Sequence, residues 1–128
     1  METISTNQAN QGSDMSSVPV LAEVTRGIVR REKYRVGDAT VARQATARRL
    51  RIGLGTLKNL VYERIKTVSS ELRDRIVAAA IADLSNEINK LEYEKQLLVQ
   101  MGTSPDHNDM RALEGVLATA RQAIERMR

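Results

Sequence analysis

Cysteine, phenylalanine and tryptophan are absent from this chain, and histidine occurs once, at His107. Without cysteine there are no disulfides, no zinc sites of the Cys/His type and no thiol catalysis, which fits a reducing, cytoplasmic setting. No apolar run reaches the roughly eighteen residues of a membrane span, and the N-terminus lacks the layout of a signal peptide. Three tyrosines are the only aromatic residues, too few for a surface that binds single-stranded nucleic acid by stacking.

Catalytic signatures are missing as well. No glycine-rich phosphate loop follows a predicted strand, no nucleophile has a recognisable setting, and the acidic residues are scattered over solvent-facing helix positions. We therefore expect no enzyme activity and no catalytic residues. We also expect no metal, no cofactor, no membrane partner and no small-molecule ligand.

The positive charge is concentrated in one segment. The chain carries a net charge of +4, but residues 26–66 alone hold twelve Arg or Lys against three Asp or Glu, a net +9. Residues 1–25 and 67–128 carry net charges of −3 and −2. This distribution is expected when a polyanion binds only one part of a molecule. A solvated basic surface without a partner is the plain alternative.

The apolar spacing predicts an all-α fold in three parts. Residues 1–17 are rich in Ser, Thr, Asn and Gln, with almost nothing to bury, and we expect a disordered arm. Residues 18–68 predict three short helices, which we expect over about 19–33, 39–51 with Asp38 as N-cap, and 54–64. Residues 69–128 predict two longer helices.

Residues 47–60 combine turn glycines, basic residues and helical apolar spacing. Two short helices crossing at a tight turn would bury the set Ala47, Leu50, Ile52, Leu57 and Leu60. The pattern Ala-x-x-Leu-x-Ile-Gly-x-Gly-Thr-Leu-x-x-Leu resembles the helix-turn-helix of bacterial and phage transcription regulators. In that family Ala47 matches the small buried position of the first motif helix, and Leu57 and Leu60 match buried positions of the recognition helix. Two departures stand out: Arg51 replaces a common glycine, which indicates a turn shifted toward Gly53, and Thr46 replaces an aliphatic residue.

The resemblance implies that the third helix enters the major groove of double-stranded DNA. Asn59 would pair with adenine, Lys58 would donate to guanine, and Thr56 would reach a phosphate or a thymine methyl group. Tyr62 is the last-ranked base contact. The residues expected at phosphates are Arg48, Arg49, Arg51, Arg64 and Lys66, with the backbone amides of Gly53 and Gly55. Arg26, Arg30 and Arg31 on the first helix can lie across phosphates too, although an ordinary solvated charge competes with this interpretation for each arginine.

Residues 69–128 predict an antiparallel, coiled-coil-like hairpin. Ser69 is expected to cap the long helix, Gly102 to end it, and Ser104 with Pro105 to start the last helix. Apolar residues repeat at heptad spacing along both helices, with one polar interruption at Lys95, and these seams face each other. The first seam is Val77, Ile81, Leu84, Ile88, Leu91, Lys95 and Leu98, and the second is Met110, Leu113, Leu117, Ala120, Ile124 and Met127.

Apolar residues outside the seams predict a homodimer. A lone hairpin would leave four of these side chains exposed to solvent: Tyr93, Leu97, Val99 and Val116. We therefore expect a second copy to cover them in a four-helix bundle. Packing of these residues on the head of the same chain is the alternative. The residues assigned to dimerisation are Val77, Ile81, Leu84, Ile88, Leu91, Leu98, Leu113, Leu117 and Ile124.

These features lead to three hypotheses. The first is a sequence-specific, double-stranded-DNA-binding transcription regulator, a repressor that acts as a homodimer on a palindromic operator and is cytoplasmic and nucleoid-associated. The second is a DNA-packaging assembly protein resembling phage terminase small subunits, whose hairpins form a higher oligomer. The third is a helical adaptor whose basic face binds an acidic protein. Oligomer size separates the first two, and the salt dependence of binding separates the third.

Overall fold

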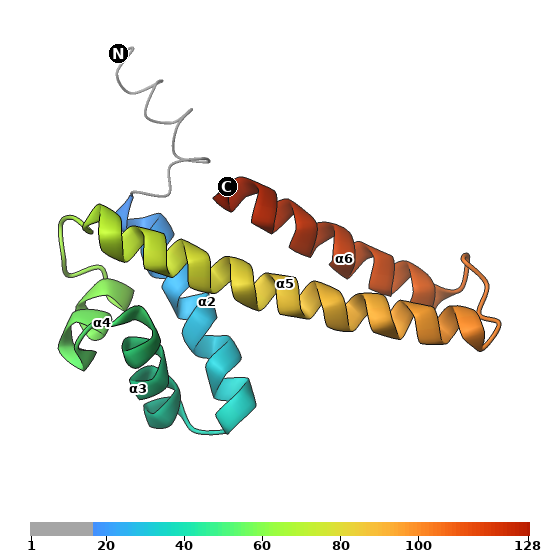
Figure 1. The fold of residues 1–128 in the computed structure, drawn as a ribbon, viewed down its shortest axis with the longest axis horizontal. Helices are drawn as coiled ribbons and strands as arrows, with labels where there is room; N and C mark the ends of the chain where they lie inside the picture. The colour runs from blue at the N-terminus through green and yellow to red at the C-terminus, as the bar shows by residue number, and fades with distance from the viewer. Residues whose placement is uncertain (1–16) are drawn as a thin grey trace, which may run out of the picture. The chain divides into compact units, whose positions relative to one another are not determined.

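The computed structural model describes residues 17–128, where every regular element is a helix (Figure 1). The all-α class is confirmed, and no strand occurs between residues 17 and 128. The expected arm, residues 1–17, lies outside the described residues except for Ser17. The helices are α2 (Val18–Val36), α3 (Ala39–Leu50), α4 (Leu54–Val61), α5 (Ser70–Gln100) and α6 (Asn108–Met127). None of these described helices is long and apolar enough to cross a membrane.

The chain divides into two compact units inside α5. The first ends at Ala80, and the second runs from Ile81 to Arg128. The sequence suggested a division between residues 68 and 69, in the loop before α5. Leu72 and Ile76 explain the difference, because both are buried, and the start of α5 thus belongs to the core of the first unit.

Local chemistry explains where the first helices begin and end. The Ser17 hydroxyl accepts a hydrogen bond from the Val20 amide at 3.3 Å, and Pro19 occupies the first turn of α2. The Asp38 carboxylate caps α3 in the same way, 2.9 Å from the Val41 amide. Between them Gly37 adopts φ 80°, a left-handed conformation that glycine tolerates best. Helix α2 therefore continues to Val36, three residues beyond the predicted end.

The core of the first unit is made by large apolar side chains from each of its helices. Helix α2 packs against both α3 and α4, and α3 packs against α4. The fully buried side chains include Leu21, Ile28, Leu50, Leu57, Leu60 and Ile76. Burial of each such side chain contributes roughly 1.5–3 kcal/mol.

Two threonines lie in this core, and the hydroxyl group of each has a hydrogen-bond partner. The Thr46 hydroxyl donates to the Ala42 carbonyl at 2.8 Å, and Thr25 donates to the Leu21 carbonyl at 2.7 Å. Each hydroxyl is satisfied within its own helix, and each methyl group remains available for packing. Thr46 and Thr25 can therefore occupy the core alongside apolar side chains.

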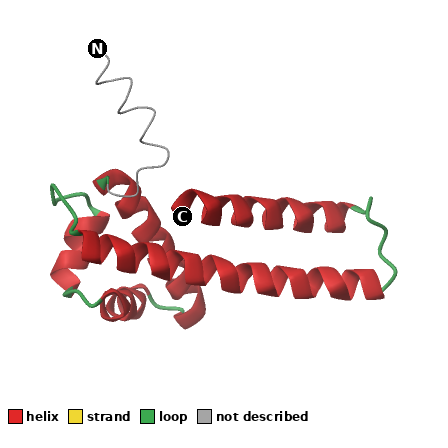
Figure 2. Ribbon diagram, turned by 45° about the horizontal axis from the view of Figure 1, so that its top comes forward, coloured by secondary structure: helices red, strands yellow, loops and turns green. Residues whose placement is uncertain are grey.

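In the second unit, the remainder of α5 and α6 lie side by side and run in opposite directions (Figure 1; Figure 2). Helix α6 buries Met110, Leu117, Ala120 and Ile124, four members of the predicted seam. Two ion pairs join the helices, Lys95 with Glu114 at 2.6 Å and Arg121 with Glu92. The hydrogen bond to Glu114 raises the pKa of Lys95 above its ordinary value, so the polar interruption of the α5 seam is charged and paired.

The residues assigned to dimerisation differ in exposure. Leu117 is fully buried and Ile124 almost so, whereas the others keep part of their surface exposed. The off-seam residues are the more exposed set: Tyr93 at 63%, Leu97 at 40%, Val99 at 57% and Val116 at 49%.

The connection between α5 and α6 differs from the expected one at its second half. Gly102 ends α5 as predicted, with φ 80° and a bond from the Thr103 amide to the Leu98 carbonyl at 3.0 Å. The prediction of Ser104 as N-cap is wrong, because α6 begins only at Asn108. The Ser104 hydroxyl instead accepts from the Asp106 amide at 3.2 Å within a turn. His107 is the N-cap, its Nδ1 accepting from the Asp109 amide at 3.1 Å.

Candidate nucleic-acid interface

The turn between α3 and α4 consists of Arg51, Ile52 and Gly53, and it begins at Arg51, the C-cap of α3. Arg51 adopts φ 60° and ψ 43°, and the Ile52 amide donates to the Ala47 carbonyl at 3.0 Å. This left-handed closure of a helix normally uses glycine. The expected shift toward Gly53 is wrong, since Gly53 has an ordinary extended backbone with φ −72°.

Helix α4 has one buried and one exposed face. Leu57 and Leu60 are fully buried, whereas Thr56, Lys58 and Asn59 are exposed. Three of the predicted base-reading side chains are thus exposed on a short helix anchored by its leucines. Tyr62, the fourth, follows the helix and is 65% exposed.

The start of α4 is open. Gly53 is its N-cap and supplies no side-chain hydrogen bond to the first turn. A Cβ atom added at Gly53 or Gly55 would meet nothing within 4 Å. Neither glycine has a positive φ, so neither backbone conformation nor internal packing requires glycine here.

Helix α4 ends at Val61, three residues earlier than predicted. Glu63 takes φ 57°, and the Arg64 amide donates to the Asn59 carbonyl at 2.7 Å, which repeats the closure seen after α3. Beyond this turn the Arg64 guanidinium stacks over the Tyr62 ring, 5.1 Å from its centroid. The stack holds two predicted DNA-contacting side chains together just beyond the end of α4.

The surface of α3 and α4 carries charge of one sign. Residues 39–62 contain five Arg or Lys and no Asp or Glu. Four exposed cations predicted to contact phosphates or bases form no hydrogen bond or ion pair with any residue from 17 to 128: Arg48, Arg51, Lys58 and Lys66. Cationic side chains without internal partners keep their full capacity for an anionic ligand.

Other arginines of the basic segment hold the first unit together. The Arg49 side chain donates to the Ala79 carbonyl of α5 at 3.0 Å. Arg26 donates to the Val61 carbonyl and lies 3.7 Å from the Glu63 carboxylate, so it ties α2 to the end of α4. Arg26 and Arg49 were both expected near phosphates, and these contacts give them a structural role.

One exposed group on α3 was missed from the sequence. Gln44 is exposed one helical turn before Arg48, and residues four apart lie on the same helix face. Its amide extends the polar surface toward the start of α3. The spacing of four residues between Gln44 and Arg48 is the sequence signal that could have identified it.

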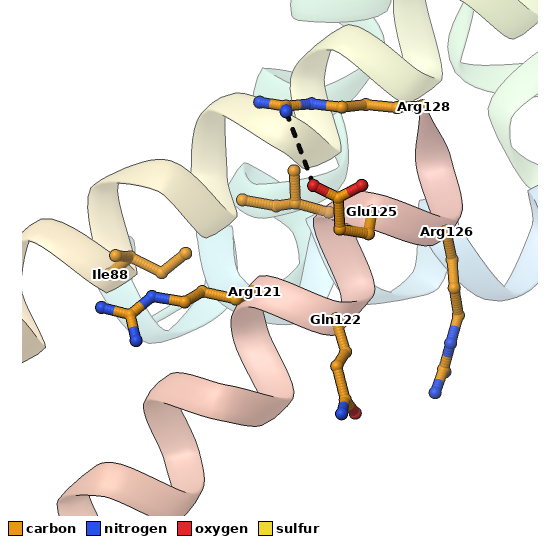
Figure 3. A pocket seen from close by; sticks show the side chains of 7 residues that line it. Ile88, Arg121, Gln122, Glu125, Arg126 and Arg128 are labelled. Atoms are coloured by element: carbon orange, nitrogen blue, oxygen red, sulfur yellow. Dashed lines mark ion pairs between the residues drawn. The ribbon is translucent and has the colours of Figure 1, made fainter.

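A second candidate site lies in the second unit (Figure 3). A hollow of about 690 Å³ is lined by Ile88 of α5 and, on α6, by Arg121, Gln122, Ile124, Glu125, Arg126 and Arg128. Arg121 is paired with Glu92, and an Arg128 nitrogen lies 3.7 Å from the Glu125 carboxylate. Two of the three arginines that line the hollow are therefore already paired with carboxylates, which leaves little positive charge for an anionic ligand. Nowhere in residues 17–128 do three or more His, Cys, Asp or Glu side chains gather as they would around a metal ion.

The exposed, acid-free surface of α3, the turn and α4 is thus the strongest candidate for a functional site in the described chain. Comparison of the chain with protein families, with curated proteins and with solved structures found no match.

Proposed function

We propose that this chain is a double-stranded-DNA-binding transcription regulator that acts as a homodimer on a palindromic operator and represses the adjacent gene. In this proposal α3, the turn and α4 form a helix-turn-helix, with α4 as the recognition helix. The helices α5 and α6 form the hairpin that joins two copies. The two-fold symmetry of such a dimer matches the symmetry of the operator.

The exposed face of α4 carries the proposal. Leu57 and Leu60 anchor the helix in the core, which leaves Lys58 and Asn59 exposed and adjacent. An amide can pair bidentately with adenine, and an ammonium group can donate to guanine, in the major groove. The short helix thus presents two side chains whose chemistry suits base edges.

The cations around this helix supply the second part of the support. Arg48, Arg51 and Lys66 are exposed, and no acidic residue occurs between residues 39 and 62. Contacts of this kind position a protein on the phosphate backbone without reading sequence. The open first turn at Gly53 and Gly55 adds backbone amides that a phosphate can approach closely.

A selection experiment followed by titration tests the proposal. Random duplex DNA is enriched for binding to the full chain, and affinities for the selected site and for scrambled DNA are then measured by fluorescence anisotropy. The double variant Lys58→Ala/Asn59→Ala should lose most of the roughly 10- to 100-fold preference that each base-reading pair provides. Binding to scrambled DNA should change far less.

The matched control is Gln122→Ala/Arg126→Ala, which also removes one amide and one cation. Both side chains are exposed on α6 and extend away from Ile88 (Figure 3). Full discrimination should be retained in this control. The base-reading assignment would be refuted if both double variants discriminated equally well, and the DNA proposal would fail if the unaltered chain bound no duplex at any salt concentration.

A further inference from the structure

The two edges of the contact between α5 and α6 are unlike. One edge, the ion-pair edge, is crossed by Lys95–Glu114 and Arg121–Glu92. The other edge, the apolar edge, is an open groove of about 530 Å³ whose apolar lining is Leu97, Leu98, Met101, Ala112, Leu113 and Val116. The apolar edge offers a continuous apolar surface, which gains free energy by being covered.

The exposed part of this edge forms a stripe along α5. Tyr93, Leu97 and Met101 are spaced four residues apart, so they follow one another along one face of the helix. Their exposed fractions are 63%, 40% and 78%. Val116 of α6 borders the same groove and is 49% exposed.

We propose that a second copy of this chain docks antiparallel on the apolar edge, with the two-fold axis passing beside Leu97. The inference rests on the homodimer in the proposed function and assigns its interface; it does not depend on DNA binding. Leu97 is the midpoint of the stripe, so a two-fold axis there brings Leu97 onto Leu97 of the second copy. It also brings Tyr93 of each copy onto Met101 of the other, and a thioether packs favourably against an aromatic ring.

The area of the patch suits a second copy. Tyr93, Leu97, Met101 and Val116 together expose roughly 450 Å², about the apolar share of the 800 Å² that each partner contributes to a standard interface. A second copy brings an apolar stripe of the same length to cover it.

Charges beside the stripe are complementary under the same symmetry. Lys90 lies seven residues before Leu97, about 10 Å along the helix. It is exposed and has no ion pair within the described part of the chain. On the other side of the axis, beyond Met101, lie two exposed carboxylates, Asp106 in the connection and Asp109 in the first turn of α6. Antiparallel docking places Lys90 of each copy toward these carboxylates of the other, whereas parallel docking brings like charges together.

Single-cysteine variants test this arrangement, because the native chain contains no cysteine. Under mild oxidation of the full chain without DNA, Leu97→Cys should form a disulfide-linked dimer in high yield, since a residue at a two-fold axis meets itself within bonding distance. Val99→Cys is the matched control. Val99 is more exposed than Leu97, at 57% against 40%, but it belongs to a different surface depression, next to Glu92 and Lys95 of the ion-pair edge. The Val99→Cys chain should therefore remain monomeric on a denaturing gel.

Direction is tested with a mixture of Tyr93→Cys and Met101→Cys chains. The antiparallel arrangement predicts mostly mixed dimers between the two variants, whereas a parallel arrangement gives mostly like-with-like dimers. Light scattering supplies the mass: the unaltered chain and Val99→Asp should be dimeric, and Leu97→Asp monomeric with unchanged helix content.

The inference would be overturned by a monomeric unaltered chain, by a ring of eight or more subunits, by crosslinking at Val99 in place of Leu97, or by like-with-like crosslinks. None of these results would alter whether the Lys58→Ala/Asn59→Ala variant loses discrimination. The two proposals therefore fail separately.

Discussion

The guanidinium of Arg75 donates a hydrogen bond to the Leu50 carbonyl at 3.3 Å and so joins α5 to the last residue of α3. In the opposite direction, the Arg49 side chain of α3 donates a hydrogen bond to the Ala79 carbonyl of α5. The Leu50 carbonyl lies at the C-terminal end of α3, where carbonyls have no partner in their own helix and a cation interacts well with the helix dipole. This pair of contacts orients the proposed helix-turn-helix on the start of α5.

Loss of the Arg75 contact should destabilise the first unit. We expect Arg75→Ala to lower the free energy of unfolding by about 1 kcal/mol, because a hydrogen bond from a charged, partly buried donor is removed. Urea unfolding followed by circular dichroism measures the change. Arg111→Ala, an exposed arginine on α6, is the control and should be neutral; an equal loss in both variants would argue against a specific role for Arg75.

The left-handed backbone of Arg51 leads to a prediction in which stability and DNA affinity move in opposite directions. Arg51→Gly should leave stability unchanged or raise it by up to about 1 kcal/mol, because glycine tolerates φ 60° without strain. DNA affinity should fall, since a cation is lost.

The matched change is Arg48→Gly, inside the last turn of α3. It removes the same charge but places glycine in regular helix, which costs about 1 kcal/mol. Thermal unfolding and anisotropy on the two variants separate the effects. Equal destabilisation by both would contradict the special conformation of Arg51.

Gly55 offers a test for close approach of a ligand to the backbone. Its added Cβ would meet nothing within 4 Å in the free protein, and alanine favours helix by up to about 1 kcal/mol. Gly55→Ala should therefore melt at the same or a higher temperature, yet bind DNA at least roughly tenfold more weakly if a phosphate lies against this turn.

Gly115 provides the comparison, because it lies in α6 and its added Cβ also has open space. Gly115→Ala should be stabilised in the same way and should bind DNA normally. Unchanged affinity in both alanine variants would remove the start of α4 from the proposed interface.

The Lys95–Glu114 pair predicts a stability change at alkaline pH. The pKa of Lys95 is raised in the folded chain, so its stabilising contribution is fully present below the ordinary lysine pKa. It is lost as the pH rises through the folded value. As the pH rises from 9 to 12, the free energy of unfolding should fall less for Lys95→Met than for the unaltered chain. Chemical unfolding at each pH measures this difference. Lys33→Met, which removes an exposed lysine without an ion pair in the described chain, should follow the unaltered curve.

Much of the fold could be predicted because local rules agree with the packing. Pro19, Asp38, Ser69 and Gly102 mark helix ends by their own chemistry, and the α6 seam predicted the buried residues of that helix. The base-reading candidates were also predictable as exposed, since they alternate with Leu57 and Leu60 at helical spacing.

The remaining features depended on distant partners. Local propensity disfavours a left-handed arginine, yet the Ile52–Ala47 hydrogen bond and the packing of α4 impose that conformation on Arg51. The structural roles of Arg26 and Arg49 depend on carbonyls 35 and 30 residues away. Ser104 lost the cap position because His107, nearer the start of α6, supplies an equivalent acceptor.

The closed turns after α3 and α4 also govern how a protease meets this chain. Trypsin cleaves after arginine and lysine, and Arg43, Arg48, Arg49 and Arg51 make the end of α3 one of its richest targets. A protease needs several residues in extended form, which here requires the Ile52–Ala47 bond and the end of α3 to open first. This basic stretch should therefore be cut late, and DNA bound as we propose would delay cleavage further.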